Sequence, residues 1–197
     1  MRNRPFHTAL YTGLALLALG PLLAQPYYLN NASFEGEPQD ATVPIGWFPC
    51  EPGTTPDILP GFWGVYQEAA EGETFVGLIT RENGTWESIT QRLPATLREP
   101  QCYTFNLDLA RAPTYSGYSR PLKLRIWGGT DKCGKAQLLY ESPLIEHTRW
   151  QKYGVEFVPE QPINYLIFEA FHSERSFRYA GNILLDNISP IQLCPRA

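Results

Sequence analysis

Residues 74–92 read TFVGLITRENGTWESITQR. Two runs rich in Thr, Phe, Val, Ile and Trp flank the pair Asn83-Gly84, and residues of these types are enriched in β-strands. Asn and Gly both accept the positive φ angles of the tightest hairpin turns, so the pair marks a reversal of the chain. The stretch therefore predicts two strands, 74–81 and 85–92, joined as a β-hairpin.

Similar short runs continue to the end of the chain. Apolar side chains alternate along residues 103–109 and 122–126, which is the period of a strand with one buried face. The further strands that we expect are 102–110, 122–127, 153–158, 165–171 and 182–191. Residues 138–145 are expected to form no more than one helical turn, because Pro143 interrupts them. The pattern predicts an all-β sandwich.

The first 24 residues have the features of a secretory signal peptide. Arg2 and Arg4 precede an apolar run from Ala9 to Ala24, and we expect cleavage after Ala24. Residues 25–197 would then form a single β-sandwich domain that is secreted, periplasmic or at the cell surface. No later apolar run approaches the roughly 20 residues of a spanning helix, so no membrane span is expected after cleavage.

The charge and cysteine content limit the classes of partner. Residues 25–197 hold 14 Lys and Arg against 20 Asp and Glu, and a chain this acidic is a poor candidate for nucleic acid. The four cysteines of an exported chain predict two disulfides, for which three pairings are possible. We expect strands 102–110 and 122–127 to be antiparallel neighbours, which brings Cys102 to Cys133 and leaves Cys50 for Cys194.

Several motifs occur in an ordered series along the chain. They are NASFE at 31–35, EGETF at 71–75, SITQ at 88–91, the strand 102–110, Trp150 with VEF at 155–157, and NILLDN at 182–187. This series resembles the jelly-roll, galactose-binding-like β-sandwiches of carbohydrate-binding modules. Gly46-Trp47 followed by Thr55-Pro56-Asp57 is similar to a W…TPD pattern in uncharacterised secreted and envelope proteins of Gram-negative bacteria.

The resemblance implies a structural calcium ion where the first and last strands meet. Its ligands would be Ser33, Glu35, Glu71, Thr74 and Asp186, with Ser33 and Thr74 acting through their carbonyl oxygens. Calcium takes six to eight oxygen ligands, and it would neutralise Asp186, which lies in a strand that should be buried. The alternative is that Asp186 accepts backbone N–H bonds or pairs with an Arg.

Aromatic residues in loops are the candidates for sugar stacking. Residues 54–65, TTPDILPGFWGV, place an aromatic pair in an irregular stretch, and residues 113–118 form a second such loop. The candidate carbohydrate-binding residues are Trp47, Asp57, Phe62, Trp63, Arg111, Tyr115 and Tyr118. We expect Trp63 and Tyr118 to be accessible, with Trp47 below them. Alternatively, Phe62 and Trp63 plug the sandwich, and Asp57 and Arg111 are structural. Trp86 and Trp150 are interpreted as core residues, and Trp127 as either.

These observations favour a secreted, non-catalytic glycan-binding module with a structural calcium site. One alternative is an adhesion or scaffold module that binds cell-envelope proteins. Another is a glycoside hydrolase that uses two carboxylates drawn from Asp108, Glu156 and Glu169, which all fall in expected strands. The sequence holds no G-x-S-x-G and no H-E-x-x-H motif for other hydrolytic chemistry.

Overall fold

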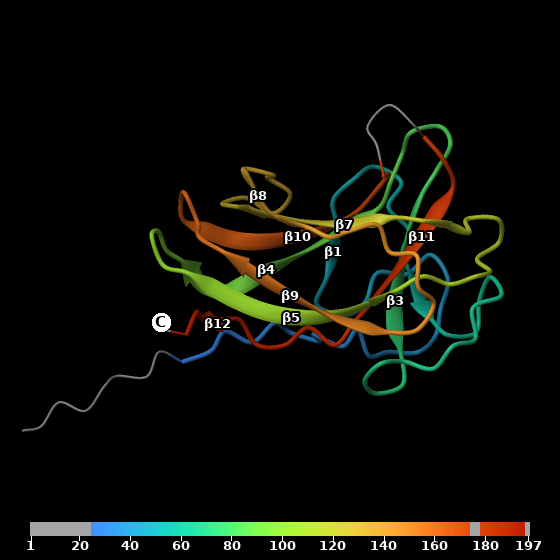
Figure 1. Cartoon of the computed structure of the whole chain (residues 1–197), viewed down its shortest axis with the longest axis horizontal. Coiled ribbons are helices and arrows are strands. Elements are labelled where there is room, and N and C mark those ends of the chain that lie inside the picture. The colour runs from blue at the N-terminus through green and yellow to red at the C-terminus, as the bar shows by residue number, and fades with distance from the viewer. Residues whose placement is uncertain (1–24, 174–177, 196–197) are drawn as a thin grey trace, which may run out of the picture.

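Two β-sheets lie face to face in the computed structural model, which describes residues 25–173 and 178–195 (Figure 1). The expected signal peptide, residues 1–24, lies outside these residues. The strands are β1 (Phe48–Pro49), β2 (Asp57–Leu59), β3 (Phe75–Thr80), β4 (Ser88–Leu97), β5 (Tyr103–Ala110), β6 (Arg120–Pro121), β7 (Lys123–Gly129), β8 (Gln137–Glu141), β9 (Gln151–Phe157), β10 (Ile163–Phe171), β11 (Gly181–Asp186) and β12 (Gln192–Leu193). The expectation of an all-β sandwich is confirmed.

The five-stranded sheet has the order β1-β4-β10-β7-β8. The seven-stranded sheet has the order β12-β5-β11-β3-β2, with β9 added along β5 and β6 along β11. All of these pairs are antiparallel except β6 with β11. The first and last described segments meet where Tyr27 bridges Ile191.

The main core fills the space between the two sheets. Alternate residues of each strand point inward, as the period of two requires. Leu124 and Ile126 of β7 and Phe168 of β10 meet Leu78 of β3 and Leu185 of β11, all fully buried. Burial of apolar area at about 25 cal/mol per Å² is the main force that holds the layers together.

A second, smaller apolar cluster lies on the other side of the seven-stranded sheet. It contains Leu59, Val65, Phe75, Ile79, Ala110, Ala112, Tyr115 and Leu184. The loops 60–65 and 111–118 cover this outer face, and every residue of β3 and β11 is therefore buried. Part of the stretch 54–65 is regular, since Asp57–Leu59 pairs with β3.

The hairpin expected at 74–92 forms only at its turn. Arg81 N–H donates to the Thr85 carbonyl at 2.9 Å, and Thr80 bridges Trp86. Beyond this bridge the two strands separate, because β3 belongs to the seven-stranded sheet and β4 to the five-stranded sheet. Residues 138–145 also differ from expectation, because Gln137–Glu141 is strand β8 and pairs with β7.

The predicted disulfide pairing is wrong, although two disulfides are present. Cys50 is bonded to Cys133, and Cys102 to Cys194, each with a Cα–Cα distance of 5.3 Å. The prediction failed because β5 and β7 are not neighbours but lie in different sheets. Cys102 precedes β5, and Cys194 follows β12, which pairs with β5.

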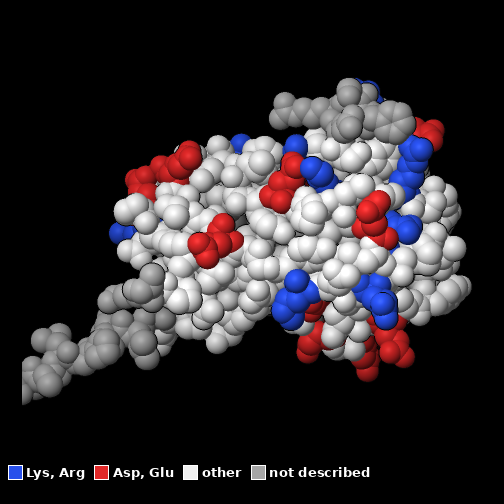
Figure 2. Space-filling model, in the orientation of Figure 1, with Lys and Arg blue, Asp and Glu red and all other residues white. Residues whose placement is uncertain are grey.

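The surface seen in Figure 2 carries positive and negative side chains interspersed, with no broad patch of one sign. No helix that could cross a membrane is found within 25–173 and 178–195.

Candidate functional site

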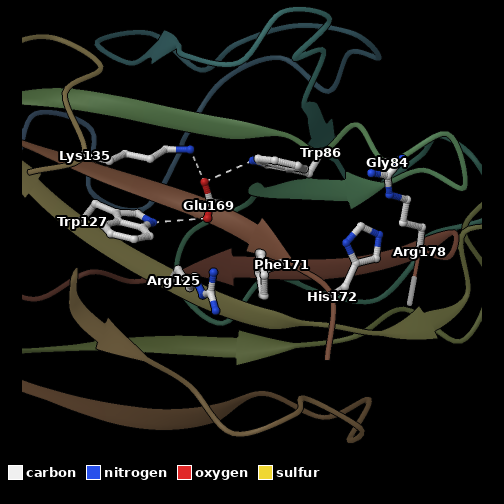
Figure 3. A pocket seen from close by; sticks show the side chains of 9 residues that line it. All are labelled: Gly84, Trp86, Arg125, Trp127, Lys135, Glu169, Phe171, His172 and Arg178. Atoms are coloured by element: carbon white, nitrogen blue, oxygen red, sulfur yellow. Dashed lines mark hydrogen bonds and ion pairs between the residues drawn. The ribbon is translucent and has the colours of Figure 1, made fainter. Parts of the chain in front are cut away.

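A groove of about 380 Å³ lies on the outer face of the five-stranded sheet (Figure 3). Alternation places Phe168 and Ala170 of β10 in the core, so Glu169 and Phe171 face outward. The same holds in β7, where Arg125 and Trp127 point away from the core. The lining residues are Gly84, Trp86, Arg125, Trp127, Lys135, Glu169, Phe171, His172 and Arg178.

Glu169 holds the two tryptophans of the groove in place. Its carboxylate is almost fully buried and accepts the indole N–H of Trp86 at 3.1 Å and of Trp127 at 3.2 Å. Lys135 donates to the same carboxylate and also to Glu51. Because both indole N–H groups donate to the same carboxylate, the orientations of the two rings are fixed relative to each other.

The Cys50–Cys133 disulfide braces one wall of this groove. It joins the segment after β1, which carries Glu51, to the β7–β8 turn, which carries Lys135. The ion pair between Lys135 and Glu51 therefore connects two segments that are also covalently linked. The disulfide thereby helps to hold Lys135 beside Glu169.

Guanidinium groups provide hydrogen-bond donors along the groove. Arg125 lies over the Phe171 ring, and its Nε donates to Glu141 at 2.7 Å. The bonds from Lys123 and Arg125 lower the pKa of Glu141 against the opposing effect of burial. Burial lowers the pKa of His172, which favours its neutral form at pH 7. The groove thus combines fixed aromatic faces with polar donors, which suits a ligand that has both C–H faces and hydroxyl groups.

Four of the sequence-predicted residues meet in a different place, a loop pocket of about 330 Å³. We use this name for the pocket that is lined by Asp57, Trp63, Tyr115 and Tyr118 together with Ala41, Thr55, Ile79, Arg81 and Ser116. It lies over the outer face of the seven-stranded sheet, on the opposite side of the sandwich from the groove. Phe62 does not line it and packs against the small outer cluster instead.

Trp47 and Arg111 lie outside both pockets. Trp47 is in the main core, in contact with the Phe34 and Phe168 rings, and its indole N–H donates to the Asn31 carbonyl. The expectation that Trp47 lies below Trp63 and Tyr118 is corrected by this burial between the sheets. Arg111 donates to the carbonyl oxygens of Ala112 and Ser119, which holds its own loop together.

Asp186 and Glu35 point at the same turn, residues 70–73. Asp186 is fully buried and accepts N–H bonds from Ala70, Glu71 and Asn187 at 2.7–3.0 Å. Glu35 accepts the N–H of Glu73, and its carboxylate occupies space that a side chain at Gly72 would fill. Burial, opposed by these N–H bonds and reinforced by the charge of Glu35, raises the pKa of Asp186 to about 7.

The other expected calcium ligands contribute different groups. The Thr74 hydroxyl donates to the Phe34 carbonyl at 3.0 Å and accepts the N–H of Gly36, so it ties the opening segment to the 70–73 turn. Ser33 lies in the turn that leads into this segment. The Glu71 side chain is exposed, and its backbone N–H reaches Asp186. Glu35 and Asp186 form no ion pair within the described part of the chain.

The interpretation of Trp86 as a core residue is wrong, because its indole lines the groove together with Trp127 and Glu169, neither of which the sequence singles out as a binding residue. Arg125 and Trp127 alternate with core residues, as do Glu169 and Phe171, so the outward position of each pair could be inferred from the strand period. The missing information was that β7 and β10 are neighbours, with Glu169 opposite Arg125. Asp108, Glu156 and Glu169 do not converge, because the first two lie in the seven-stranded sheet.

Comparison with known proteins identifies the fold. A xylan-binding domain, the first family-22 carbohydrate-binding module of Xyn10C from Paenibacillus barcinonensis, matches with a TM-score of 0.56 and 16% identity over 88% of this chain and 99% of the module. The fold is that of jelly-roll carbohydrate-binding modules. A cyclase from Fischerella sp. TAU has a TM-score of 0.58 and 15% identity over 88% of this chain and 98% of the cyclase.

An adhesin domain shows the same architecture. The K3 cleaved adhesin domain of Lys-gingipain from Porphyromonas gingivalis has a TM-score of 0.52 and 16% identity over 79% of this chain and 96% of that domain. No family model and no curated protein matches the sequence. At these identities the likeness concerns the fold, which hosts binding, adhesion and catalysis in its known members.

Proposed function

We propose that this protein is a secreted, non-catalytic module that binds a glycan in the groove of the five-stranded sheet. The observation that carries the proposal is the Trp86–Glu169–Trp127 arrangement, which presents two indole rings in fixed orientation beside the Arg125 guanidinium. Sugar rings stack their C–H faces on such aromatic surfaces, and guanidinium groups donate to their hydroxyls. The xylan-binding domain with the same fold supports a polysaccharide as the ligand class.

The number of carboxylates that line the groove supports binding rather than hydrolysis. Glu169 is the single carboxylate among the described residues that line the groove, and indole N–H groups and Lys135 occupy its oxygens. Glycoside hydrolysis commonly uses two carboxyl groups about 5–10 Å apart across the sugar bond. The two disulfides support an exported location, since such bonds persist in oxidising compartments.

Trp127→Ala tests this proposal. Affinity electrophoresis in gels that contain xylan, β-glucan or another soluble polysaccharide should show retardation of the wild type by at least one polymer. The variant should bind that polymer about tenfold more weakly, because loss of a stacked aromatic contact is worth roughly 1–1.5 kcal/mol. Tyr66→Ala removes an exposed aromatic side chain that lines neither pocket and serves as the matched control. Equal retardation of Trp127→Ala and wild type would place glycan binding outside the groove.

We also propose a structural calcium ion between Glu35 and Asp186. Two carboxylates that face one turn, with hydroxyl and carbonyl oxygens of Thr74 and Phe34 nearby, form the hard oxygen donor set that Ca²⁺ prefers. When bound, the ion would neutralise these carboxylates. It would thereby link the opening segment to the 70–73 turn and to β11.

The pH dependence of stability follows from Asp186. Without calcium, the folded state retains a proton on this carboxyl between the ordinary pKa of 3.8 and about 7, where the unfolded state has lost it. The free energy of unfolding should therefore fall as pH rises through this window, on the order of 2–4 kcal/mol. Asp186→Asn should remove this decline, which is the difference to measure in thermal melts with chelator.

Calcium should restore the free energy of unfolding that the protein loses between about pH 4 and pH 8. A ligand that binds only the folded state at one hundred times its Kd contributes about 2.7 kcal/mol. Adding CaCl₂ should therefore raise the Tm of the wild type at pH 8 and leave that of Asp186→Asn nearly unchanged. If the wild type melts at the same temperature in CaCl₂ and in EDTA, the calcium site does not exist.

A further inference from the structure

Two strained residues hold an exposed tryptophan at the loop pocket. Trp63 has φ of 56° and Ser116 has φ of 44°, both in the left-handed region that residues other than Gly, Asn and Asp seldom adopt. The two residues are bonded to each other, since Ser116 N–H donates to the Trp63 carbonyl at 3.0 Å. Thr114 Oγ1 donates to the Gly64 carbonyl at 2.7 Å and ties the same two loops together.

The strained backbone places the Trp63 indole at the surface. Trp63 is 47% exposed although its neighbours Phe62 and Val65 pack against the small outer cluster. Backbone strain of this kind costs of order 1–3 kcal/mol per residue and persists where the surrounding structure imposes it, as at ligand-binding sites. The loops therefore keep a large aromatic face out of the core, at a pocket that already contains polar side chains.

The floor of the pocket is a buried hydrogen-bonded pair. Asp57 is 5% exposed, and its carboxylate accepts the Tyr115 hydroxyl and, at 2.7 Å, the Ala41 N–H. Burial, together with the charge of Asp57, raises the pKa of Tyr115 well above its usual value, so this hydroxyl remains a donor. A carboxylate has about four acceptor positions, and the two bonds leave Asp57 with capacity for a ligand hydroxyl.

The Asp57–Tyr115 hydrogen bond can form because residue 77 is a glycine. A Cβ at Gly77 would lie 2.4 Å from the Tyr115 hydroxyl oxygen, so any side chain there would displace Tyr115. Gly77 is opposite Asp57 in the β2–β3 ladder. The sheet thus leaves room for the Tyr115 ring to reach Asp57 from the far loop.

Arg81 supplies donors on another wall of the pocket. Its guanidinium is paired with the fully buried Glu87 at 2.6 Å and lies 3.3 Å from the Thr55 hydroxyl. Because Glu87 pairs with Arg81, Asp57 is the remaining charged side chain among the described residues that line the pocket. Sugar hydroxyls both donate and accept, and so they match guanidinium N–H donors on one wall and a carboxylate acceptor at the floor.

We propose that the loop pocket is a second carbohydrate site, separate from the groove, that binds a neutral sugar residue. The ring stacks on Trp63, and its hydroxyls bond Asp57 and Arg81. An acidic sugar is disfavoured, because its carboxylate would meet the charge of Asp57, and the one cation among the described residues that line the pocket, Arg81, is paired with Glu87. The two sites have no lining residue in common and lie on opposite faces of the sandwich, so the module can engage two glycan segments.

Saturation-transfer NMR with small glycosides tests the second site without relying on the groove. The probes are the methyl glycosides of glucose, galactose, mannose and xylose, with methyl glucuronide as the acidic comparison. We expect at least one neutral glycoside to bind the wild type and Tyr66→Ala equally, and its binding to be retained in Trp127→Ala, in which only the groove is altered. Trp63→Ala should bind it about tenfold more weakly, and methyl glucuronide should give no signal with any of these proteins.

Trp63→Asn is a second variant for the same test. Asparagine tolerates a positive φ, so it removes the indole while retaining the strained backbone. Loss of neutral glycoside binding in both Trp63 variants, with retention in Trp127→Ala, supports the second site. Binding that survives in Trp63→Asn, or that disappears in Trp127→Ala, overturns it, as does the absence of any neutral glycoside signal. In polysaccharide retardation, the loss seen in Trp127→Ala reports on the groove and the loss seen in Trp63→Ala on the loop pocket, so failure of one site is distinguishable from failure of the other.

Discussion

Replacing both Cys102 and Cys194 by serine should lower the free energy of unfolding by about 4 kcal/mol, within the range of 2–5 kcal/mol for disulfides of small exported domains. The bond joins residues 92 positions apart, and a cross-link over so long a loop removes much of the entropy of the unfolded chain. It also fixes the short strand β12 to β5, where two ladder pairs form. Guanidinium unfolding followed by tryptophan fluorescence measures the difference.

The matched control is the double variant Cys50→Ser with Cys133→Ser. Its loop of 83 positions is nearly as long, so the entropic effect should be similar in size. The two variants should differ in function, because only the Cys50–Cys133 bond braces Lys135 and Glu51 at the groove. Thiol labelling of the single variant Cys102→Ser should modify Cys194 alone. Labelling of Cys133 instead would contradict the Cys102–Cys194 pairing.

Glu169→Ala should have the largest effect on ligand binding. It leaves two indole N–H groups and Lys135 without their common acceptor, and removing one partner of a buried ion pair costs about 3–5 kcal/mol of stability. Both tryptophans lose their fixed orientation together, so polysaccharide affinity should fall about a hundredfold, twice the free energy expected for one ring. Affinity electrophoresis and thermal melts measure the two effects.

Glu169→Gln separates the shape of this side chain from its charge. The amide retains one acceptor oxygen but presents N–H₂ to the other donor, so binding and stability should fall between those of wild type and Glu169→Ala. Glu156→Ala is the control, because Glu156 is an exposed strand glutamate in the other sheet and lines neither pocket. Unchanged affinity in Glu169→Ala would show that the orientation of the two rings does not determine binding.

The loop residues were partly foreseeable and partly not. Binding residues concentrate on loops, which makes Asp57, Trp63, Tyr115 and Tyr118 candidates from sequence, and these four line one pocket. Trp47 has a similar loop setting, between Gly46 and Pro49, yet it is buried between the sheets. Local sequence does not distinguish the two cases, because the burial of a loop aromatic depends on which way its loop folds.

Local sequence patterns predict seven of the twelve strands in the described residues (β3, β4, β5, β7, β9, β10 and β11), the turn at Asn83-Gly84 and the presence of two disulfides. These are local properties, since the period of two and the φ preferences of Asn and Gly act over a few residues. The tertiary structure alone decided which strands share a sheet, and with it the Cys50–Cys133 and Cys102–Cys194 pairs.

The groove also depends on which strands are neighbours in the folded protein. Trp86, Trp127 and Glu169 come from segments 41 to 83 positions apart in the chain, and their hydrogen bonds exist only because β4, β10 and β7 are adjacent. Pairing between distant strands is a property of the whole sheet, and the alternation within each strand fixes which face a side chain occupies but not its neighbour. That is why Trp86 is interpreted from sequence as a core residue and Trp127 as either, whereas the folded sandwich places both indoles on the Glu169 carboxylate.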